Sequence, residues 1–310
     1  MLRNIMNSGP SVLRPSKANT ELTTSLRANF TSHRLAQTSP HSNQPPSFRS
    51  WTTQDSSTLY IPTQDFTTGG LAEERKAYDI TLKLFFLPDV PPTLRCAHTK
   101  EALDLVLRTL GVTSVDLVIV AFPGIHFDAD DESDSDTERG SLPSPASSAA
   151  DPSLPPATDP VEPIESMART WRTLEALHAA GQVAKLGLSE FGTQRLARFL
   201  PATTIRPAVD QINVRDCCVV PKSLIMFAKR EGIELLTHND WADVLPRGTL
   251  RELLGDGESG MGVLSGPREE GEGLKGDIEP LWVIKYTAVV KDRGVVENKG
   301  YFAGAELNER

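Results

Sequence analysis

Three adjacent polar residues, His238, Asn239 and Asp240, lie at the end of a strand predicted at 233–238. An imidazole and a carboxylate can exchange protons or hold a polar ligand. Parallel α/β proteins place their sites at the carboxyl ends of strands, which is where this triplet would lie. A ligand site and a polar strand end that bonds only to the neighbouring loop are both open, and the triplet alone names no reaction.

The adjacent cysteines Cys217 and Cys218 are a second candidate for chemistry. A disulfide between neighbouring residues is disfavoured because its geometry is strained. A thiol that a partner chain could reach and a buried, unreactive thiol both remain open, and burial is the commoner fate of a free cysteine.

Two further motifs are rejected by their context. Gly255, Gly257 and Gly260 satisfy the spacing G-x-G-x-x-G, but no strand leads closely into them, and Asp256 and Glu258 would repel a pyrophosphate. The chain also has no G-x-S-x-G nucleophile elbow. We therefore expect neither a dinucleotide-binding glycine loop nor a serine hydrolase.

The net charge of −9 is concentrated in one segment, since residues 128–138 hold seven carboxylates. The rest of the chain carries about −2, which leaves no basic footprint for nucleic acid or an anionic membrane. Three cysteines without a C-x-x-C pattern argue against a disulfide framework or a zinc site, so we expect a reducing, cytoplasmic environment and no bound metal. No apolar run reaches the roughly 18 residues of a membrane span.

Residues 1–75 lack sustained periodicity, so we expect a largely disordered N-terminal arm there and one folded domain at 76–310. The first 50 residues carry six basic side chains against a single acid, Glu21, a balance also typical of a mitochondrial transit peptide. Five prolines in the same stretch interrupt any long amphipathic helix. The disordered arm is the favoured interpretation, with mitochondrial import as the alternative.

From residue 78 onward, short apolar runs alternate with amphipathic stretches, which predicts parallel strands joined by helices. The predicted strands are 80–87, 117–122, 183–188, 208–214, 233–238 and 295–299. The predicted helices are 99–110, 164–180, 194–200, 221–232 and 281–293. Periodicity alone does not separate a closed barrel from an open sheet.

Two segments interrupt this alternation. Residues from about 124 to 163 are acidic and rich in Pro and Ser, a composition that cannot offset its ordering entropy by burial, so we expect a disordered insert. Residues from about 255 to 276 contain eight glycines and are expected to form a mobile loop.

Residues 171–191 (WRTLEALHAAGQVAKLGLSEF) resemble the segment of aldo-keto reductases that leads from the fourth helix into the fifth strand. Residues 208–214 and 233–240 are similar to the sixth and seventh strands of that family, and the resemblance covers most of 78–300. It implies an α/β fold, a TIM-type (β/α) barrel incomplete at its N-terminal strands, with NADP(H) at the carboxyl ends of the strands.

The family protonates a carbonyl with a Tyr that is backed by Lys, Asp and His during hydride transfer. Lys83 matches the Lys, whereas Ala121 stands where the family has His. No strand with a paired Asp and Tyr precedes Tyr78, and Tyr60 is a poor candidate for the acid. The resemblance therefore implies a scaffold whose only residual catalytic group is Lys83.

On the cofactor side, Ser189 and Gln211 match the residues that hold the nicotinamide, while Glu190 replaces an Asn and His238 replaces the stacking Tyr. Lys299 stands where the family has a Lys on the adenosine phosphate, but the Arg and Asn that should follow are absent. The resemblance leaves NADP(H) binding open and makes no cofactor a requirement.

A closer resemblance is to the regulatory, or modifier, subunits of glutamate-cysteine ligase, a degenerate branch of this barrel. Residues 211–240 carry that family's Cys-Cys-Val, Pro-led helix and Leu-Leu-Thr-His-Asn-Asp strand end, and residues 282–301 resemble its C-terminal segment. The resemblance implies a non-catalytic subunit that pairs with the ligase's catalytic subunit and tunes glutamate affinity and glutathione feedback.

The most family-specific segment supplies the candidates for partner contact, which are Cys217, Cys218, His238, Asn239 and Asp240. The alternative function is a working NADP(H)-dependent oxidoreductase of the aldo-keto reductase type.

Overall fold

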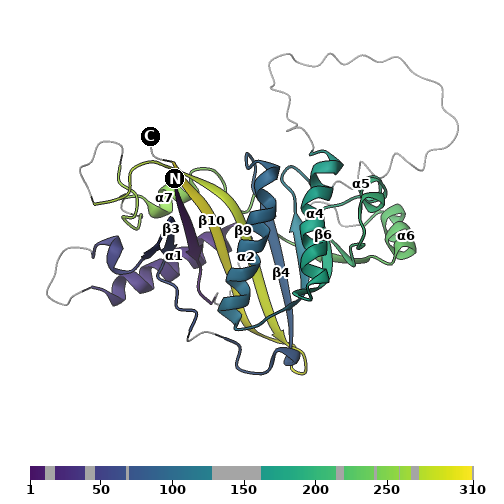
Figure 1. Cartoon of the computed structure of the whole chain (residues 1–310), viewed down its shortest axis with the longest axis horizontal. Helices are drawn as coiled ribbons and strands as arrows, with labels where there is room; N and C mark the ends of the chain where they lie inside the picture. The colour runs from purple at the N-terminus through teal and green to yellow at the C-terminus, as the bar shows by residue number, and fades with distance from the viewer. Residues whose placement is uncertain are drawn as a thin grey trace, which may run out of the picture.

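The described residues of the computed structural model are 1–10, 18–38, 46–67, 70–127, 162–213, 220–240, 243–257, 259–266 and 272–308. They contain a single ten-stranded sheet with the strand order β2-β3-β1-β10-β9-β4-β5-β6-β7-β8 (Figure 1). One half of this sheet is parallel and the other half is mainly antiparallel. No helix among the described residues has both the length and the apolar character needed to cross a membrane.

The parallel half confirms the predicted alternation of strands and helices. Its strands are β4 (Tyr78–Phe86), β5 (Val115–Ala121), β6 (Val183–Ser189), β7 (Val209–Asn213) and β8 (Glu234–His238). Its helices are α2 (Arg95–Leu110), α4 (Ile164–Ala179), α5 (Thr193–Phe199) and α6 (Lys222–Glu231). Helices α2 and α6 each end at a glycine in the left-handed conformation, Gly111 and Gly232, where a side chain would be strained.

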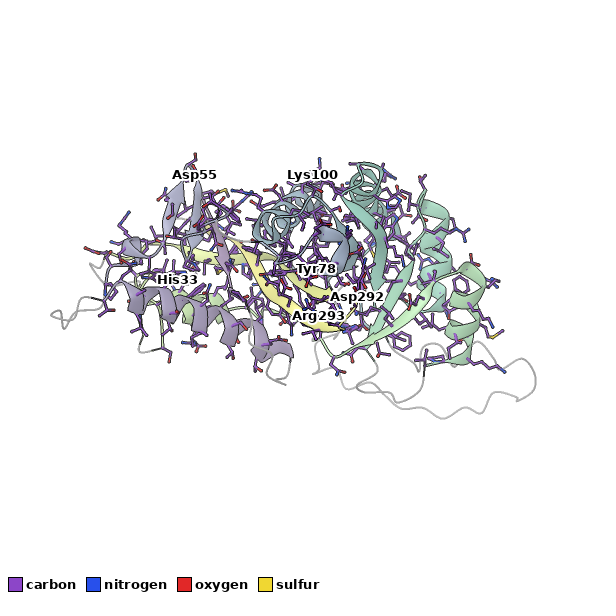
Figure 2. All side chains as sticks on the ribbon, turned by 90° about the horizontal axis from the view of Figure 1, so that it is seen from below. His33, Asp55, Tyr78, Lys100, Asp292 and Arg293 are labelled. Atoms are coloured by element: carbon purple, nitrogen blue, oxygen red, sulfur yellow. The ribbon has the colours of Figure 1, made fainter. Side chains whose placement is uncertain are left out.

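The antiparallel half corrects one prediction. The helix predicted at 281–293 is the strand β9 (Asp277–Val290), which pairs with β4 on one side and with β10 (Val295–Asn308) on the other. Residues 281–290 are rich in β-branched and aromatic side chains, which fit a strand paired on both sides. The turn that holds Asp292 and Arg293 lies beside Tyr78, where β4 begins (Figure 2).

The N-terminal residues also differ from the expected disordered arm. Strand β1 (Leu2–Asn7) pairs with β10 and with β3 (Thr58–Ile61), and β2 (Thr53–Asp55) forms the outer edge. Helix α1 (Ala18–Ala36) buries Leu22, Leu26 and Phe30, which recur every four residues. This helix lies on the face of the sheet opposite α2 and α4 (Figure 2). The stabilising contacts come from strands distant in the sequence, so no local pattern indicated them.

The two predicted loops are only partly described. Residues 128–161 of the insert, and residues 258 and 267–271 of the Gly-rich loop, lie outside the described residues. The described part of the loop follows α7 (Thr249–Leu254) and contains a bridge between Leu264 and Leu274. Arg27 and Arg34 of α1 donate to the main-chain carbonyls of the loop.

The α/β class is confirmed, and the sheet of the described residues runs from β2 to β8 without being closed by hydrogen bonds between these two edge strands. The main core includes the face of β4 to β6 beneath α2 and α4. A second, separate apolar cluster of Leu117, Ile119 and Val209, flanked by Leu236, lies on the other face of the parallel half. That face also carries the polar residues described next.

Candidate functional site

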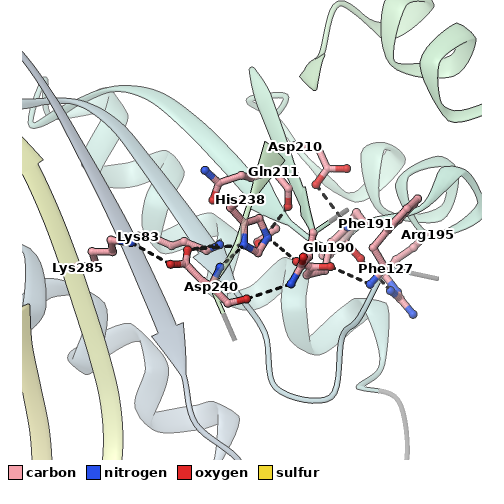
Figure 3. Close-up of polar contacts among 12 residues, drawn as sticks. Lys83, Phe127, Glu190, Phe191, Arg195, Asp210, Gln211, His238, Asp240 and Lys285 are labelled. Carbon is pink, nitrogen blue, oxygen red and sulfur yellow. Dashed lines mark hydrogen bonds and ion pairs between the residues drawn. The ribbon is translucent and has the colours of Figure 1, made fainter. Parts of the chain in front are cut away.

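A buried carboxylate between two lysines forms the centre of the site. Asp240, just beyond β8, accepts hydrogen bonds from Lys83 of β4 at 3.1 Å and from Lys285 of β9 at 2.9 Å (Figure 3). The two lysines are directly paired in the β4–β9 register, so they project from the same face of the sheet. The side chains of Lys83, Asp240 and Lys285 are 5%, 11% and 23% exposed, respectively.

The charges of this cluster perturb one another. Burial by itself raises the pKa of the Asp240 carboxyl, but the ammonium groups of Lys83 and Lys285 outweigh it and hold that pKa far below its ordinary value. Burial lowers the pKa of Lys83, and the Asp240 and Glu190 carboxylates oppose that change. Asp240 is therefore ionised at neutral pH and serves as the shared counter-ion of both lysines.

His238 links this cluster to Glu190. The backbone N–H of Asp240 donates to His238 Nδ1 at 3.1 Å, and His238 Nε2 contacts a carboxylate oxygen of Glu190. Because Nδ1 accepts a hydrogen bond, the proton of the neutral ring lies on Nε2, directed at Glu190. The other carboxylate oxygen of Glu190 accepts from the backbone N–H of Phe127 at 2.9 Å. His238 is thus held from both sides by the protein itself.

Glu190 has φ = 68°, a conformation that is strained for a residue with a side chain. Its backbone N–H donates to the carbonyl of Gln211 at 2.9 Å, and Arg195 donates to its carbonyl at 3.3 Å. These bonds hold the turn after β6 and direct the Glu190 carboxylate at His238. The resemblance implied a neutral Asn at position 190.

The predicted cofactor residues are brought together only in part. Ser189 donates to the carbonyl of Gln211 at 3.2 Å and lies 3.4 Å from His238 Nε2. The side-chain oxygen of Gln211 is buried without a hydrogen-bond partner among the described residues, as a group awaiting a donor would be. Lys299, however, forms an ion pair with Glu21 of α1. With Lys299 neutralised and the Glu190 carboxylate at the nicotinamide side, these residues do not fit a complete NADP(H) site.

All four tyrosines of the chain are described, and none of them pairs with Lys83. Tyr60 lies in β3, which β1, β10 and β9 separate from β4. Tyr78 donates to Glu297 at 2.6 Å, at the start of β4. Burial raises the pKa of both Tyr286 and Tyr301. A tyrosine with a raised pKa, outside hydrogen-bond contact with Lys83, is not the activated proton donor of a carbonyl reductase.

Ala121 occupies the position at which the resemblance implies a histidine, and it lies among the described residues. Ala121 ends β5 directly opposite Phe85 of β4, on the face of the sheet that carries Lys83. A methyl group there can neither donate nor accept a hydrogen bond. Two of the three groups that accompany the family's Lys are therefore absent around Lys83, and the third, a carboxylate, comes from Asp240 beyond the last strand of the parallel half.

Of the residues predicted to contact a partner, only some are described, and only one of those has an exposed side chain. Cys217 and Cys218 lie outside the described residues. Asn239 is exposed and its side chain is available to a ligand or partner, whereas His238 and Asp240 are engaged in internal contacts. Lys285 was missed because residues 281–293 were expected to be a helix. The alternation of Lys285 and Thr287 with the apolar residues Ile284, Tyr286 and Ala288 is the signal in the sequence that could have placed it on a strand.

Comparison with known proteins identifies the family. The sequence model of the aldo/keto reductase family matches residues 51–251, and this chain belongs to that family. Within it, the chain is 27% identical to the mouse (Mus musculus) glutamate–cysteine ligase regulatory subunit over 235 residues, which cover 76% of this chain and 68% of that protein. The regulatory subunit of Homo sapiens is 26% identical over the same shares of the two chains.

Reductases are similar over shorter stretches. Aldose reductase B of Dictyostelium discoideum is 26% identical over 165 residues, which cover 51% of this chain and 48% of that one. Among solved structures, the aldose reductase of Schistosoma japonicum has 23% identity and a TM-score of 0.33, covering 52% of this chain and 46% of that chain.

Proposed function

We propose that this chain is a non-catalytic regulatory subunit of glutamate-cysteine ligase, which binds the catalytic subunit and tunes its glutamate affinity and its inhibition by glutathione. The similarity to proteins named as regulatory subunits spans 76% of this chain, against 51% for aldose reductase B. The observation that carries the proposal is the Asp240 carboxylate held between Lys83 and Lys285, in a site without a paired tyrosine.

Carbonyl reduction requires a proton donor beside the substrate oxygen as hydride is delivered. Lys83 alone does not supply one, because its ammonium group is committed to Asp240 and no tyrosine among the four reaches it. The scaffold keeps the polar residues of a site while the proton-transfer pair is absent. Such a scaffold is suited to binding and not to turnover.

Regulation by binding has a thermodynamic requirement. The subunit raises the glutamate affinity of its partner only if it binds the glutamate-competent state more tightly than the other state. A coupling free energy of roughly 1–3 kcal/mol would change the apparent affinity by about 5- to 150-fold. The contact need not involve the substrate of the ligase at all.

We further propose that the partner contacts the chain near the carboxyl end of β8, where Asn239 is exposed. Cys217 and Cys218 belong to this proposal as thiols that could form a redox-sensitive link to the partner. His238 and Asp240 would act indirectly, because their internal contacts fix the backbone on either side of Asn239.

The test is to mix the purified chain with a glutamate-cysteine ligase catalytic subunit and measure ligation against glutamate concentration. We expect a lower KM for glutamate, a higher glutathione concentration for half-inhibition, and a complex that co-migrates on gel filtration. An active aldo-keto reductase of the same fold serves as the control and should change none of these. An unchanged glutamate dependence with no complex would refute the proposal.

One observation favours a second candidate function, an NADP(H)-dependent oxidoreductase. Lys83 is buried and ion-paired with an Asp, as a reductase of this family requires, although Asp240 comes from an unexpected position. The NADPH assay described in the Discussion decides between turnover and its absence.

A further inference from the structure

The last strand of the parallel half, β8, has an unpaired outer edge in the part of the chain that the structure describes. The backbone N–H of Glu234 donates to Ala208 beside β7 at 2.9 Å. Because alternate residues of a parallel strand bond to opposite sides, Glu234, Leu236 and His238 bond toward β7. The N–H and C=O groups of Leu235 and Thr237 therefore point away from the sheet, and Thr237 is exposed.

Apolar side chains are accessible on β8 and on α6, the helix that packs against β8. On the inner face, Leu236 is half-buried against the separate apolar cluster of Leu117, Ile119 and Val209. The three residues of the cluster are buried, so the half-buried Leu236 is the part of this apolar face that is accessible at β8. On the outer face, α6 exposes Ile225 at 46% and Met226 at 58%. Each is among the few large apolar side chains exposed on the described residues.

The opposite edge of the sheet has none of these features. Strand β2 is three residues long, and all three residues, Thr53–Asp55, are polar and exposed. Short, polar edges with a charged residue resist the addition of another strand. The β8 edge is longer and flanked by apolar groups, which makes it the edge suited to pairing.

The exposed face of α6 carries basic side chains, which favour a binding partner with acidic groups. This helix exposes three basic residues, Lys222, Lys229 and Arg230. Its acidic residue, Glu231, forms ion pairs with Arg206 and Arg230. Lys222 and Lys229 form no ion pair with the described residues. The outer side of the edge is thus basic and apolar, in a chain whose net charge is −9.

We infer that the outer edge of β8 and the exposed face of α6, together the β8–α6 surface, dock an extended segment of the partner chain as an added strand. The segment carries apolar side chains at alternate positions and acidic side chains on the α6 side. The inference rests on the proposed function, because the partner is taken to be the catalytic subunit of the ligase.

Strand addition explains why these features occur together. The main-chain groups of Leu235 and Thr237 would bond to the added strand, which supplies affinity without sequence preference. Side chains of that strand would alternate between the half-buried Leu236 on one face and the lysines and exposed side chains of α6 on the other. The alternation and the charge supply specificity. The added strand would lie beside Asn239, consistent with the partner contacts proposed above.

Two substitutions in the full chain test the inference. Thr237→Pro removes an N–H that points outward while leaving the bonds from β8 to β7, and Thr237→Val is its control because it keeps that N–H. Met226→Glu places a carboxylate in the apolar, basic face of α6. Val295→Glu is its control, because Val295 is 55% exposed at the distant start of β10.

Binding of each variant to the catalytic subunit is measured by sedimentation velocity, with circular dichroism and the thermal midpoint as the folding check. We expect Thr237→Pro and Met226→Glu each to raise the Kd at least about tenfold, and both controls to match the unsubstituted chain. Equal Kd values for Met226→Glu and Val295→Glu would overturn the inference even if Thr237→Pro failed to fold.

Failure of the two proposals can be told apart. If the unsubstituted chain does not bind the catalytic subunit, the proposed function fails. If it binds and the Met226→Glu variant binds equally well, only the docking surface fails. A dimer of the chain alone that Met226→Glu dissociates, without any effect on the catalytic subunit, would assign the surface to a second copy and overturn the inference.

Discussion

Lys83 and Asp240 are separated by 157 residues in the sequence and form a buried ion pair with 3.1 Å between Nζ and Oδ2. Lys83 is in β4, whereas Asp240 follows β8, and three strands lie between β4 and β8 in the sheet. The contact therefore requires the parallel half to curl back on itself. Ion pairing of Asp240 with Lys83 and Lys285 brings the end of β8 to β4 and β9, two strands with which β8 is not directly paired.

Removal of the Asp240 charge should destabilise the fold strongly. Asp240→Asn would remove the carboxylate that pairs with the buried Lys83 and the half-buried Lys285, and breaking a buried pair in this way costs about 3–5 kcal/mol. We expect a decrease of that size in the free energy of unfolding by urea, followed by tryptophan fluorescence. Asp89→Asn is the control, because Asp89 pairs with Arg247 at the surface and should lose less than about 1 kcal/mol. Equal losses in the two variants would contradict this reading of the cluster.

The titration of the buried Asp210 carboxyl should make the stability of the fold depend on pH. Burial in β7 raises the pKa of its carboxyl to about 8, whereas an unfolded Asp titrates near 4. Between these values the native state binds the extra proton, so stability falls as pH rises, by up to about 1.4 kcal/mol per pH unit. We expect Asp210→Asn to flatten the slope measured by urea unfolding between pH 6.5 and 8. An unaltered slope in that window would show that Asp210 is already ionised in the native state.

The chain should not turn over carbonyl substrates. Its Lys83 lacks a paired tyrosine, so the tyrosine that donates the proton in reductases of this family is missing from the site. We expect NADPH oxidation in the presence of small aldehydes to equal that of the Lys83→Met variant, monitored at the NADPH absorbance. Oxidation by the unsubstituted chain that depends on the carbonyl and disappears in Lys83→Met would instead establish the second candidate function.

The long β9–β10 pair makes a packing prediction. A Cβ added at Gly304 of β10 would lie 2.4 Å from the Trp282 ring of β9, far inside contact distance. Gly304→Ala should therefore lower the free energy of unfolding by about 1–3 kcal/mol. A Cβ at Gly257 would meet nothing within 4 Å, so Gly257→Ala is the control and should stay within about 0.5 kcal/mol. If both variants were equally stable, the close pairing of β9 with β10 at this position would be wrong.

Local patterns were sufficient for the parallel half. The buried strand that holds Lys83, the glycine that ends α6 and the apolar run of β8 are all encoded within a few residues. The placement of Ser189, Gln211 and His238 at one end of the strands follows from the same alternation, because parallel strands bring their carboxyl ends together.

Local patterns failed where stability comes from distant partners. Residues 281–290 contain apolar side chains at spacings that suit a helix as well as a strand, and pairing with β4 and β10 decides for the strand. Strand β1 (LRNIMN) has neither a continuous apolar run nor a regular alternation that would distinguish it from irregular chain, yet it pairs with residues some 300 positions away. The N-terminal residues are ordered by that pairing and not by their composition.

The sequence by itself determined the α/β class, the family resemblance and the absence of a histidine at Ala121, because each depends on residue types and on neighbours within one element. Only the tertiary structure decided that β8 is an edge strand among the described residues and that Asp240 is the counter-ion of Lys83 and Lys285. Both depend on the curl of the whole sheet, which brings together charges whose separation in the sequence carries no information about their distance in space.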